Sequence, residues 1–510
     1  MATSHRRTGR AARQAAAPAR ITEYGRLRHP FQPQSVISDD TVAAIHDMAL
    51  DVLEKLGLRI LLPEARQIFA AAGARVIADT EMVHIGRDIV AQALITAPRR
   101  IRMRAANPAR ELIYEEGALI FSPGSGCPNV TDAVRGRRPG SLESYEETLK
   151  LHQSFDVIHK LGPSAEPQDV PAQLRHYAMM RAQLSLADKP MFVYARGRGQ
   201  AEDGFAMIRQ AMNLTDDDFT DGVWATTVIN TNSPRQIDKP MAEGIIDFAR
   251  AGQMSIITPF CLAGAMAPVT VQGALVLQHA ECLAGITLAQ LANPGAPVSY
   301  GGFSSNVDMK SGAPAFGTPT HMQMAIGTGQ LARHVGLPWR SAAGSASNVA
   351  DMQAAGENHM GLWANLMANA TLVVHSAGWL EGGLSFGYEK FINDVEALQT
   401  IAEMCMPLDT APDDLAWAAI EDVQPGGHFF ATAHTMDRFD RAFYAPLNAD
   451  LSNHGAWTAA GAQTATDRAV GVWQQVLAGF EAPSGGQERA DRIAQFISDR
   501  SAEGGAPPVG

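Results

Sequence analysis

From residue 118 onward, short apolar runs alternate with amphipathic stretches, and this rhythm constrains the fold more than any other feature. Eight runs have the length of buried strands: 118–122, 157–161, 190–194, 223–229, 254–258, 297–301, 339–343 and 371–375. Each is followed by a stretch with helical spacing: 142–153, 172–187, 201–212, 239–251, 270–292, 318–334, 351–368 and 390–406. Alternating strands and helices form a parallel sheet, and eight units in roughly 290 residues have the size of an α/β (β/α)₈ TIM barrel. An open doubly wound sheet is the alternative, but the first loop, SPGSGCPNV, lacks its full glycine pattern.

The predicted barrel occupies residues 116–410, and the segments on either side of it break the rhythm. Residues 21–115 predict a helical extension, with helices over 39–56 and 63–72 and extended pieces near 100–104 and 111–114. Residues 411–510 predict an appendage that covers one end of the barrel or joins subunits, with a helix near 465–480 and a disordered end over 501–510. Residues 1–20 contain five arginines and no acid, which predicts a disordered basic tail.

Acidic residues outnumber basic ones, 53 against 41, and the formal net charge is −12. Nucleic-acid binding needs a basic surface, so this balance argues against it, while a cationic small substrate is compatible with it. No apolar run reaches the length of a membrane-spanning helix, although 270–292 comes closest, and we expect no membrane segment. The four cysteines form no CxxC pair, which predicts a reducing, cytoplasmic setting and no metal site.

In TIM barrels the functional side chains lie at the carboxyl ends of the strands and in the loops that follow. Those positions here are rich in aromatic and amide residues, with no lysine at a strand end and no paired metal-binding carboxylates. Schiff-base chemistry and metal-dependent hydrolysis are therefore disfavoured. Aromatic rings suit a cage for a quaternary ammonium group, because a cation over a ring face gains about 0.5–2 kcal/mol.

The predicted cage comprises four strand-end aromatics: Tyr194, Tyr300, Phe303 and Trp379. Glu166 or Glu381 would add a carboxylate near the cation, and Arg196, Asn230 or His375 would hold a substrate carboxylate. His375 ends the eighth run, and we predict His375 and Glu381 as the catalytic residues. The alternative for each ring is ordinary packing beneath the extensions, and for His375 a satisfied core position.

The stretch AAGSASNVADMQAAGEN (342–358) is small and polar and then opens a helix. Small side chains would let a large flat cofactor or a partner approach the backbone, and a helix N-terminus could instead bind phosphate. An ordinary loop with a helix cap at Asp351 is the alternative. The sequence GRG at 197–199 is too short to indicate a nucleotide site.

Several longer stretches resemble the trimethylamine methyltransferase (MttB-like) superfamily of corrinoid-linked enzymes. They are HPFQP (29–33), IHDMALDVLEKLG (45–57), LLPEAR (61–66), PVTVQGALVLQHAECLAGITLAQLANPGAPVSYG (268–301), GLPWRSAAGSASNVADMQAAGEN (336–358) and GGHFFATAHT (426–435). The resemblance covers nearly all of residues 24–483. It implies a TIM barrel that delivers a methyl group from a methylated amine to Co(I) of a separate corrinoid protein.

The archaeal trimethylamine enzymes of this superfamily carry pyrrolysine, whereas this sequence contains standard residues throughout. The resemblance therefore points to a glycine betaine-like quaternary amine as methyl donor. From the small size of the loop residues we predict that the corrinoid approaches over Gly344, Ser345, Ser347 and Asn348. Loss of a methyl group from a quaternary nitrogen releases a neutral amine, so no proton need be supplied. Three alternatives stay open: direct transfer to tetrahydrofolate, a non-catalytic betaine-binding barrel, and a lyase or aldolase on the same fold. A homo-oligomer is expected for an enzyme of this size.

Overall fold

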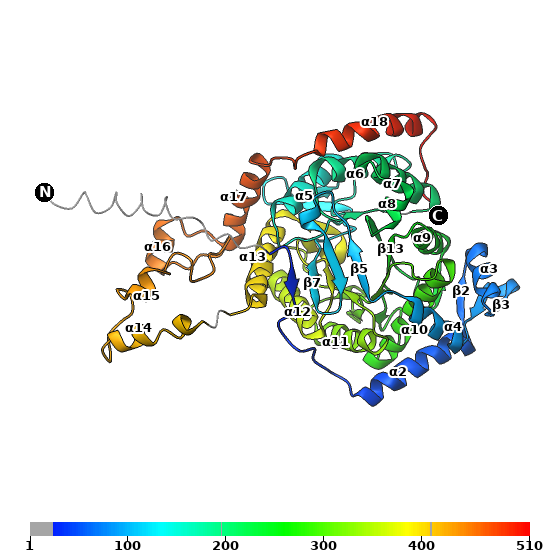
Figure 1. The fold of residues 1–510 in the computed structure, drawn as a ribbon, viewed down its shortest axis with the longest axis horizontal. Helices are drawn as coiled ribbons and strands as arrows, with labels where there is room; N and C mark the ends of the chain where they lie inside the picture. Colours follow the sequence, from blue (N-terminus) through cyan, green and yellow to red (C-terminus); the bar gives the residue numbers. More distant parts are fainter. Residues whose placement is uncertain (1–23, 195, 409–410, 510) are drawn as a thin grey trace.

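The computed structural model describes residues 24–194, 196–408 and 411–509, and the predicted basic tail at 1–20 lies outside them (Figure 1). An eight-stranded sheet forms the centre, in the order β1-β7-β19-β18-β15-β13-β11-β10. Seven of these strands are parallel: β7 (Ala118–Phe121), β10 (Met191–Phe192), β11 (Ala225–Ile229), β13 (Met254–Ile257), β15 (Val298–Gly301), β18 (Trp339–Ala342) and β19 (Leu372–Val374). The first and last strands of the predicted series, β7 and β19, are paired, so the sheet curls on itself.

The second predicted strand, 157–161, is irregular, with a turn at its start and a bend at Lys160, and is not part of a regular ladder. Its backbone donates to β7 through His159 N–H to Phe121 O at 3.0 Å and to the residue before β10 through Leu161 N–H to Pro190 O at 3.1 Å. The His159 ring takes the Phe121 N–H that a ladder would use, at 2.8 Å, and its Nε2 lies 2.7 Å from the Tyr24 carbonyl. The prediction of a strand here is therefore wrong in detail, because a side chain replaces one backbone partner.

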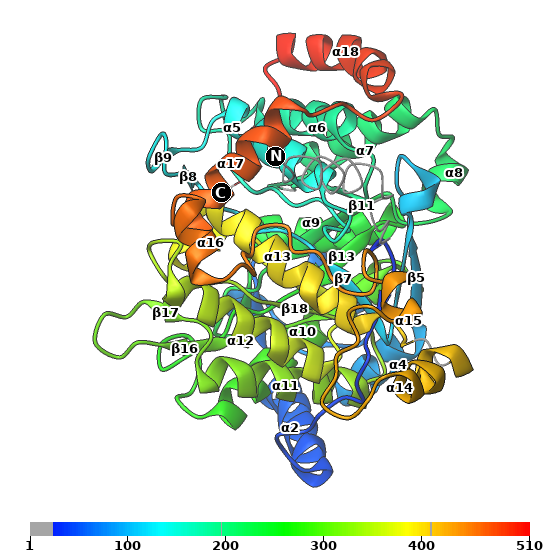
Figure 2. The same cartoon turned by 90° about the vertical axis from the view of Figure 1, so that its left-hand side faces the viewer.

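Beside this segment, β1 (Leu27–Arg28) pairs antiparallel with β7, so the beginning of the described chain fills the same edge of the sheet. The predicted helices surround the sheet in chain order: α5 (Leu142–Ser154), α6 (Arg175–Leu186), α7 (Arg198–Met212), α9 (Lys239–Arg250), α10 (Val271–Ala292), α11 (Pro319–His334), α12 (Met352–Ala368) and α13 (Tyr388–Cys405). Consecutive helices such as α11, α12 and α13 lie side by side (Figure 2). A short helix, α8 (Asp216–Thr220), is an addition that the sequence did not predict.

The apolar stretch at 270–292 forms α10, which is long and apolar enough to cross a membrane. Its side chains are almost all buried between the sheet and the N-terminal extension. Burial within the fold explains the composition of this helix, as for core helices generally.

The N-terminal extension contains the predicted helices as α2 (Asp39–Asp51), continued by a π-helical turn over Val52–Leu56, and α3 (Pro63–Ala71). The Ser38 side chain caps α2 by accepting a hydrogen bond from the Thr41 N–H. The extended pieces form a hairpin of β5 (Arg100–Met103) and β6 (Leu112–Glu115), and a small sheet of β2 (Leu58–Ile60), β3 (Arg75–Ile77) and β4 (Met82–His84) accepts β12 (Gln236–Ile237) from the barrel region.

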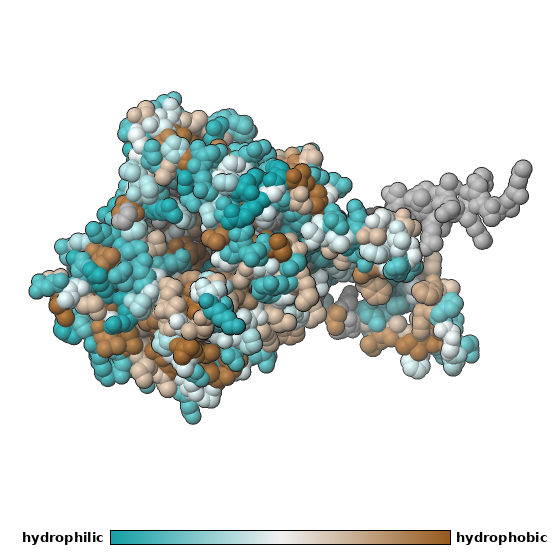
Figure 3. All heavy atoms as spheres, turned by 180° about the vertical axis from the view of Figure 1, so that it is seen from behind, coloured by the Kyte–Doolittle hydropathy of each residue, from teal (hydrophilic) through white to brown (hydrophobic). Residues whose placement is uncertain are grey.

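The appendage consists of two parts that differ in their contacts. One part is an arm with α14 (Trp417–Asp422), α15 (Ala433–Met436) and α16 (His454–Ala459), which stands out from the rest of the molecule (Figures 1 and 3). The other part is α17 (Ala465–Ala478), predicted from the sequence, and α18 (Gly486–Ala502), which packs on α6 and α7. The predicted disorder over 501–510 is wrong for the described residues, since 501–502 end α18 and Ala506 is buried.

Candidate functional site

A cavity of about 570 Å³ opens at the carboxyl ends of the parallel strands. Its wall includes residues from six of these strands or the loops directly after them: Phe192, Val228, Ile256, Phe303, Arg340 and Val374. This is where the sequence predicted the functional site. Six predicted site residues line the cavity, namely Tyr194, Arg196, Asn230, Phe303, His375 and Trp379.

Three aromatic side chains pack together on one wall of the cavity. The ring of Trp379 stacks on His375, with centroids 4.5 Å apart and planes at 21°, and Phe303 lies 5.7 Å from Trp379 and 5.3 Å from His375. Gly344 explains how Trp379 fits, because a Cβ at this position would lie 2.3 Å from the indole ring. Phe303 is also stacked on Phe316, with centroids 5.1 Å apart and planes at 14°. The wall thus brings together aromatic rings of the kind that bind quaternary ammonium groups.

His375 has an unusual backbone conformation, with φ of +58°, and its ring is fixed by a hydrogen bond. The Ser125 N–H donates to His375 Nδ1 at 3.2 Å. Nδ1 is therefore the acceptor, and in the neutral ring the proton is on Nε2. Burial, and next the charge of Arg340, holds the pKa of His375 well below its usual value, so this neutral form is the one expected near pH 7.

Arg340, on β18, is a buried cation that the sequence analysis did not single out. Its side chain extends to the cavity, with the guanidinium 5.4 Å from the Phe303 ring centre. Among the described residues, Nε and Nη1 have no hydrogen-bond partner, and Nη2 lies 3.5 Å from His375 Nε2. Because both of those nitrogens carry protons, the contact is a pair of donors side by side. An unpaired buried charge is costly, so this group of N–H donors is suited to an anion.

Lys160 is a second buried cation at the cavity, and it contradicts the prediction that no lysine lies at a strand end. It follows His159 in the irregular segment, its Nζ donates to the Leu161 carbonyl at 3.0 Å, and it lies 5.0 Å from the Phe192 ring centre. Burial lowers the pKa of Lys160 to about 7. Its amine is therefore neutral in part of the molecules at physiological pH.

Acidic side chains lie around the cavity but not in its wall: of the described residues that line it, three are basic and none is Asp or Glu. Glu381 instead forms an ion pair with Arg137, with Nη2 to Oε2 at 3.0 Å. Burial raises the pKa of Glu381, but the hydrogen bonds from Arg137 and Ser385 and the charge of Arg137 together outweigh burial and lower the pKa. Glu166 pairs closely with Arg175. Neither carboxylate is free to face a substrate cation, because each is already neutralised by an arginine.

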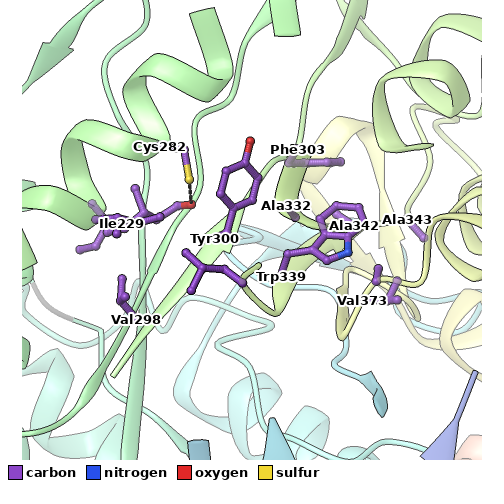
Figure 4. Close-up of a cluster of buried hydrophobic side chains, with 14 of the residues drawn as sticks. Ile229, Cys282, Val298, Tyr300, Phe303, Ala332, Trp339, Ala342, Ala343 and Val373 are labelled. Atoms are coloured by element: carbon purple, nitrogen blue, oxygen red, sulfur yellow. Dashed lines mark hydrogen bonds between the residues drawn. The ribbon is translucent and has the colours of Figure 1, made fainter. Parts of the chain in front are cut away.

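Tyr300 lies outside the cavity lining, in the buried cluster shown in Figure 4. Its hydroxyl is 2.8 Å from His279 Nδ1 on α10. Tyr300 thus belongs to the contact between β15 and α10 and not to the cage. Successive residues of a strand point to opposite faces of the sheet. The position of Tyr300 in an apolar run therefore did not show which way its side chain points.

The loop predicted to meet a corrinoid is closed by its own helix. The Glu357 carboxylate accepts from Ser345 Oγ at 2.6 Å, Ala346 N–H at 2.8 Å and Ser347 N–H at 3.2 Å. A carboxylate from α12 therefore fills the anion site that a phosphate would need. Asn348 is exposed, whereas Gly344, Ser345 and Ser347 are buried, and Asp351 caps α12 as the sequence predicted.

Comparison with known proteins decides the family. The model of the family described as "Trimethylamine methyltransferase (MTTB)" matches residues 4–505. The chain belongs to the trimethylamine methyltransferase family. Its relatives include the glycine betaine methyltransferase of Desulfitobacterium hafniense strain Y51, which is 33% identical over 92% of this chain and 98% of that protein. The trimethylamine methyltransferase MttB of D. hafniense strain DSM 10664 / DCB-2 is 28% identical over 85% and 87%.

Among solved structures, the monomethylamine methyltransferase MtmB of Methanosarcina barkeri matches with a TM-score of 0.42 and 9% identity over 96% of this chain and 97% of that one. This is a loose likeness, so the assignment depends on the sequence relatives. As a member of this family, the protein is a methyltransferase that acts on a methylated amine.

Proposed function

We propose that the protein takes a methyl group from a quaternary amine that carries a carboxylate, as glycine betaine does, and transfers it to Co(I) of a corrinoid on a separate protein. One observation carries the choice of donor. Arg340 and His375 present N–H groups without an acceptor beside the aromatic wall, in a cavity that has three basic residues and no acidic residue among its described lining.

This charge distribution distinguishes the candidate donors. Trimethylamine has no carboxylate and would leave Arg340 unpaired inside the protein, which is unfavourable. A betaine places its carboxylate on Arg340 and its methylated nitrogen against Phe303 and Trp379. The similarity to a glycine betaine methyltransferase supports the same choice.

In this mechanism the described residues bind and orient the donor. Arg340 and the Nε2–H of His375 hold the carboxylate, so the N–CH₃ bond to be broken is fixed in direction. The rings of Phe303 and Trp379 keep water away from the cation. The departing amine is neutral, so His375 and Lys160 need not supply a proton. When the corrinoid is bound, its Co(I) supplies the nucleophile.

The features around the mouth support a large flat acceptor. Exposed apolar side chains occur in the connections from β15 to α11, from β18 to α12 and from β19 to α13, namely Met309, Val349, Leu384 and Met352, which is the first residue of α12. An exposed group of this kind is typical of a docking surface. These residues take the role that we first gave to Gly344, Ser345 and Ser347. Tetrahydrofolate as direct acceptor is the second candidate.

We further infer that the sheet closes into a (β/α)₈ barrel, with 157–161 between β7 and β10. A homo-oligomer is also proposed, because the arm exposes large apolar residues that a monomer would leave in water, such as Leu415, Trp417, Phe430 and Phe443.

A cytoplasmic location is proposed as well. The four cysteines are free thiols, and three of them are buried.

The deciding experiment is methylation of free cob(I)alamin by the purified protein with glycine betaine, proline betaine, carnitine or trimethylamine. We expect methylcobalamin with at least one betaine and none above background with trimethylamine. If betaines bind but are not demethylated, and addition of tetrahydrofolate does not change this, the protein is a binding barrel. Turnover of trimethylamine alone would refute the role of Arg340.

A further inference from the structure

The residues after α18 turn back onto the barrel and end beside the substrate cavity. We name residues 503–509 the strap. Ala506 N–H donates to the Gln173 carbonyl at 3.0 Å, Gln200 Nε2 donates to the Ala506 carbonyl at 2.9 Å, and Val509 N–H donates to the Arg196 carbonyl at 2.9 Å. The strap is therefore tied by backbone bonds to the segment before α6 and to the loop after β10.

Three glycines allow this close approach. A Cβ on Gly197 would lie 2.5 Å from Val509 Cγ2, one on Gly199 would lie 3.3 Å from Ala506 Cβ, and one on Gly505 would lie 2.5 Å from the Gln173 carbonyl oxygen. Gly197 and Gly505 also have positive φ, +109° and +74°, which disfavours other residues there. The GRG sequence at 197–199 is not a complete nucleotide motif. The packing of the strap explains why two glycines occur there.

The strap lies directly behind one wall of the cavity. Pro508 lines a small adjoining cavity of about 30 Å³ together with Glu166, Tyr194 and Arg196, and Tyr194 and Arg196 also line the large cavity. The Arg196 guanidinium lies 5.2 Å from the Tyr194 ring centre and 4.0 Å from Glu166. The Arg196 side chain is 46% exposed, and its backbone carbonyl accepts the hydrogen bond from the strap.

We propose that the strap is a positioning element of the methyl-donor site: it fixes the loop after β10 and thereby places Tyr194 and Arg196 at the cavity wall. When the strap is bound, it keeps this side of the cavity closed to solvent. When the strap is released, Arg196 becomes mobile and the small cavity opens to solvent, so the donor binds less tightly. The choice of glycine betaine as test ligand rests on the proposed function. The claim that the strap holds the loop after β10 does not.

Two variants test the strap while α18 remains. The first ends the chain after Gly505. The second is Gly199→Val, which adds bulk toward Ala506 at a helical position with ordinary φ. The matched control is Gly471→Val on α17, where an added Cβ meets nothing within 4 Å. Hydrogen exchange of peptides covering 191–200 reports on the loop, and calorimetry with glycine betaine as the probe reports on the site.

We expect exchange of the 191–200 peptide to accelerate in both strap variants, with an unchanged melting temperature, and the Kd for glycine betaine to rise about tenfold. KM should rise in parallel while kcat changes little, because the strap does not touch the reacting atoms. Combining Gly199→Val with the truncation should add nothing, since both act by removing the same contact. Gly471→Val should behave as wild type.

Equal exchange of the 191–200 peptide in wild type and truncated protein would overturn the proposal, as would a loss of kcat with KM unchanged. If the wild-type protein does not bind glycine betaine at all, the proposed donor is wrong, and the exchange measurement still decides whether the strap holds the loop. Additive effects of Gly199→Val and the truncation would show that the valine acts by another route and would also refute the mechanism.

Discussion

Arg340 in the wall of the cavity and the carboxylates Glu381 and Glu166 around the cavity differ in whether they have an ionic partner. Around it, Glu381 pairs with Arg137 and Glu166 with Arg175. Inside it, the Arg340 guanidinium has two nitrogens without a partner among the described residues. Paired charges hold loops together, whereas an unpaired buried charge costs stability and is retained where a ligand supplies the counter-charge.

This difference changes how the net charge of the sequence is interpreted. The net charge of −12 was compatible with attraction of a cationic donor. The cavity wall nevertheless contains bases and no acids among its described residues. Under the proposed function, aromatic rings hold the cation of the donor, and the other end of the donor makes the ionic contact. Net charge describes the surface and not the site.

The strongest test replaces Arg340 by Met. Loss of a charge-assisted pair should weaken glycine betaine binding by about 1.5–3 kcal/mol, or roughly ten- to a hundredfold in Kd. The free protein should melt at a higher temperature, because the unpaired charge has been removed. Calorimetry and thermal unfolding measure the two effects. A lower melting temperature with unchanged Kd would show that Arg340 is structural, and the comparison would fail.

The next test concerns the aromatic wall. Trp379→Leu keeps an apolar side chain but removes the aromatic ring. The binding free energy of glycine betaine should become less favourable by about 0.5–2 kcal/mol. Tyr300→Phe is the matched control: it loses the bond to His279 but does not line the cavity, so binding should not change. If the two variants weakened binding equally, the cage would not be where the cavity places it.

Lys160 predicts a dependence on pH. Burial lowers its pKa to about 7, so the amine is charged below this value and loses its charge as pH rises. Affinity for a carboxylate donor should therefore fall a few-fold between about pH 6 and 8 in the wild type. In Lys160→Met the same titration should be flat over this range. An identical pH dependence in both proteins would show that the charge of Lys160 does not affect donor binding.

The smallest effect is expected outside the cavity. Glu381→Gln removes the ion pair with Arg137, whose side chain is 50% exposed, and should cost about 0–1 kcal/mol of stability. Donor affinity and kcat should stay within about twofold of wild type. A large loss of kcat with normal binding would restore Glu381 as a catalytic residue and would abolish the distinction between the two sets of charges.

Much of the fold could be predicted from the sequence, because apolar periodicity is a local property. The predicted helices were found close to their predicted bounds, and seven of the eight predicted runs contain parallel strands. The exception is 157–161. It could not be foreseen, because the His159 ring accepts the hydrogen bond of the Phe121 N–H, and Phe121 is 38 residues away in the sequence. The strap was missed for a similar reason: GGAPPV (504–509) has a composition typical of disorder but forms hydrogen bonds with Gln173, Arg196 and Gln200.

The site was predicted less completely than the fold. Phe303, Trp379 and His375 were recognised from their positions after apolar runs. Arg340 and Lys160 were not, although each interrupts an apolar run, WRSAA and VIHKL. A charge inside a buried strand is costly enough to be a signal by itself, and a search for such interruptions would have found both residues.

The sequence alone determined the alternation of strands and helices, the aromatic character of the strand ends and the family. Only the tertiary structure decided which charges are neutralised. Arg137 and Glu381 are 244 residues apart and yet in contact. Arg340 lies among apolar and aromatic residues, and two of its nitrogens have no partner in the part of the chain that the structure describes. Periodicity is set by neighbours along the chain, but the free energy of a charge depends on what surrounds it in space.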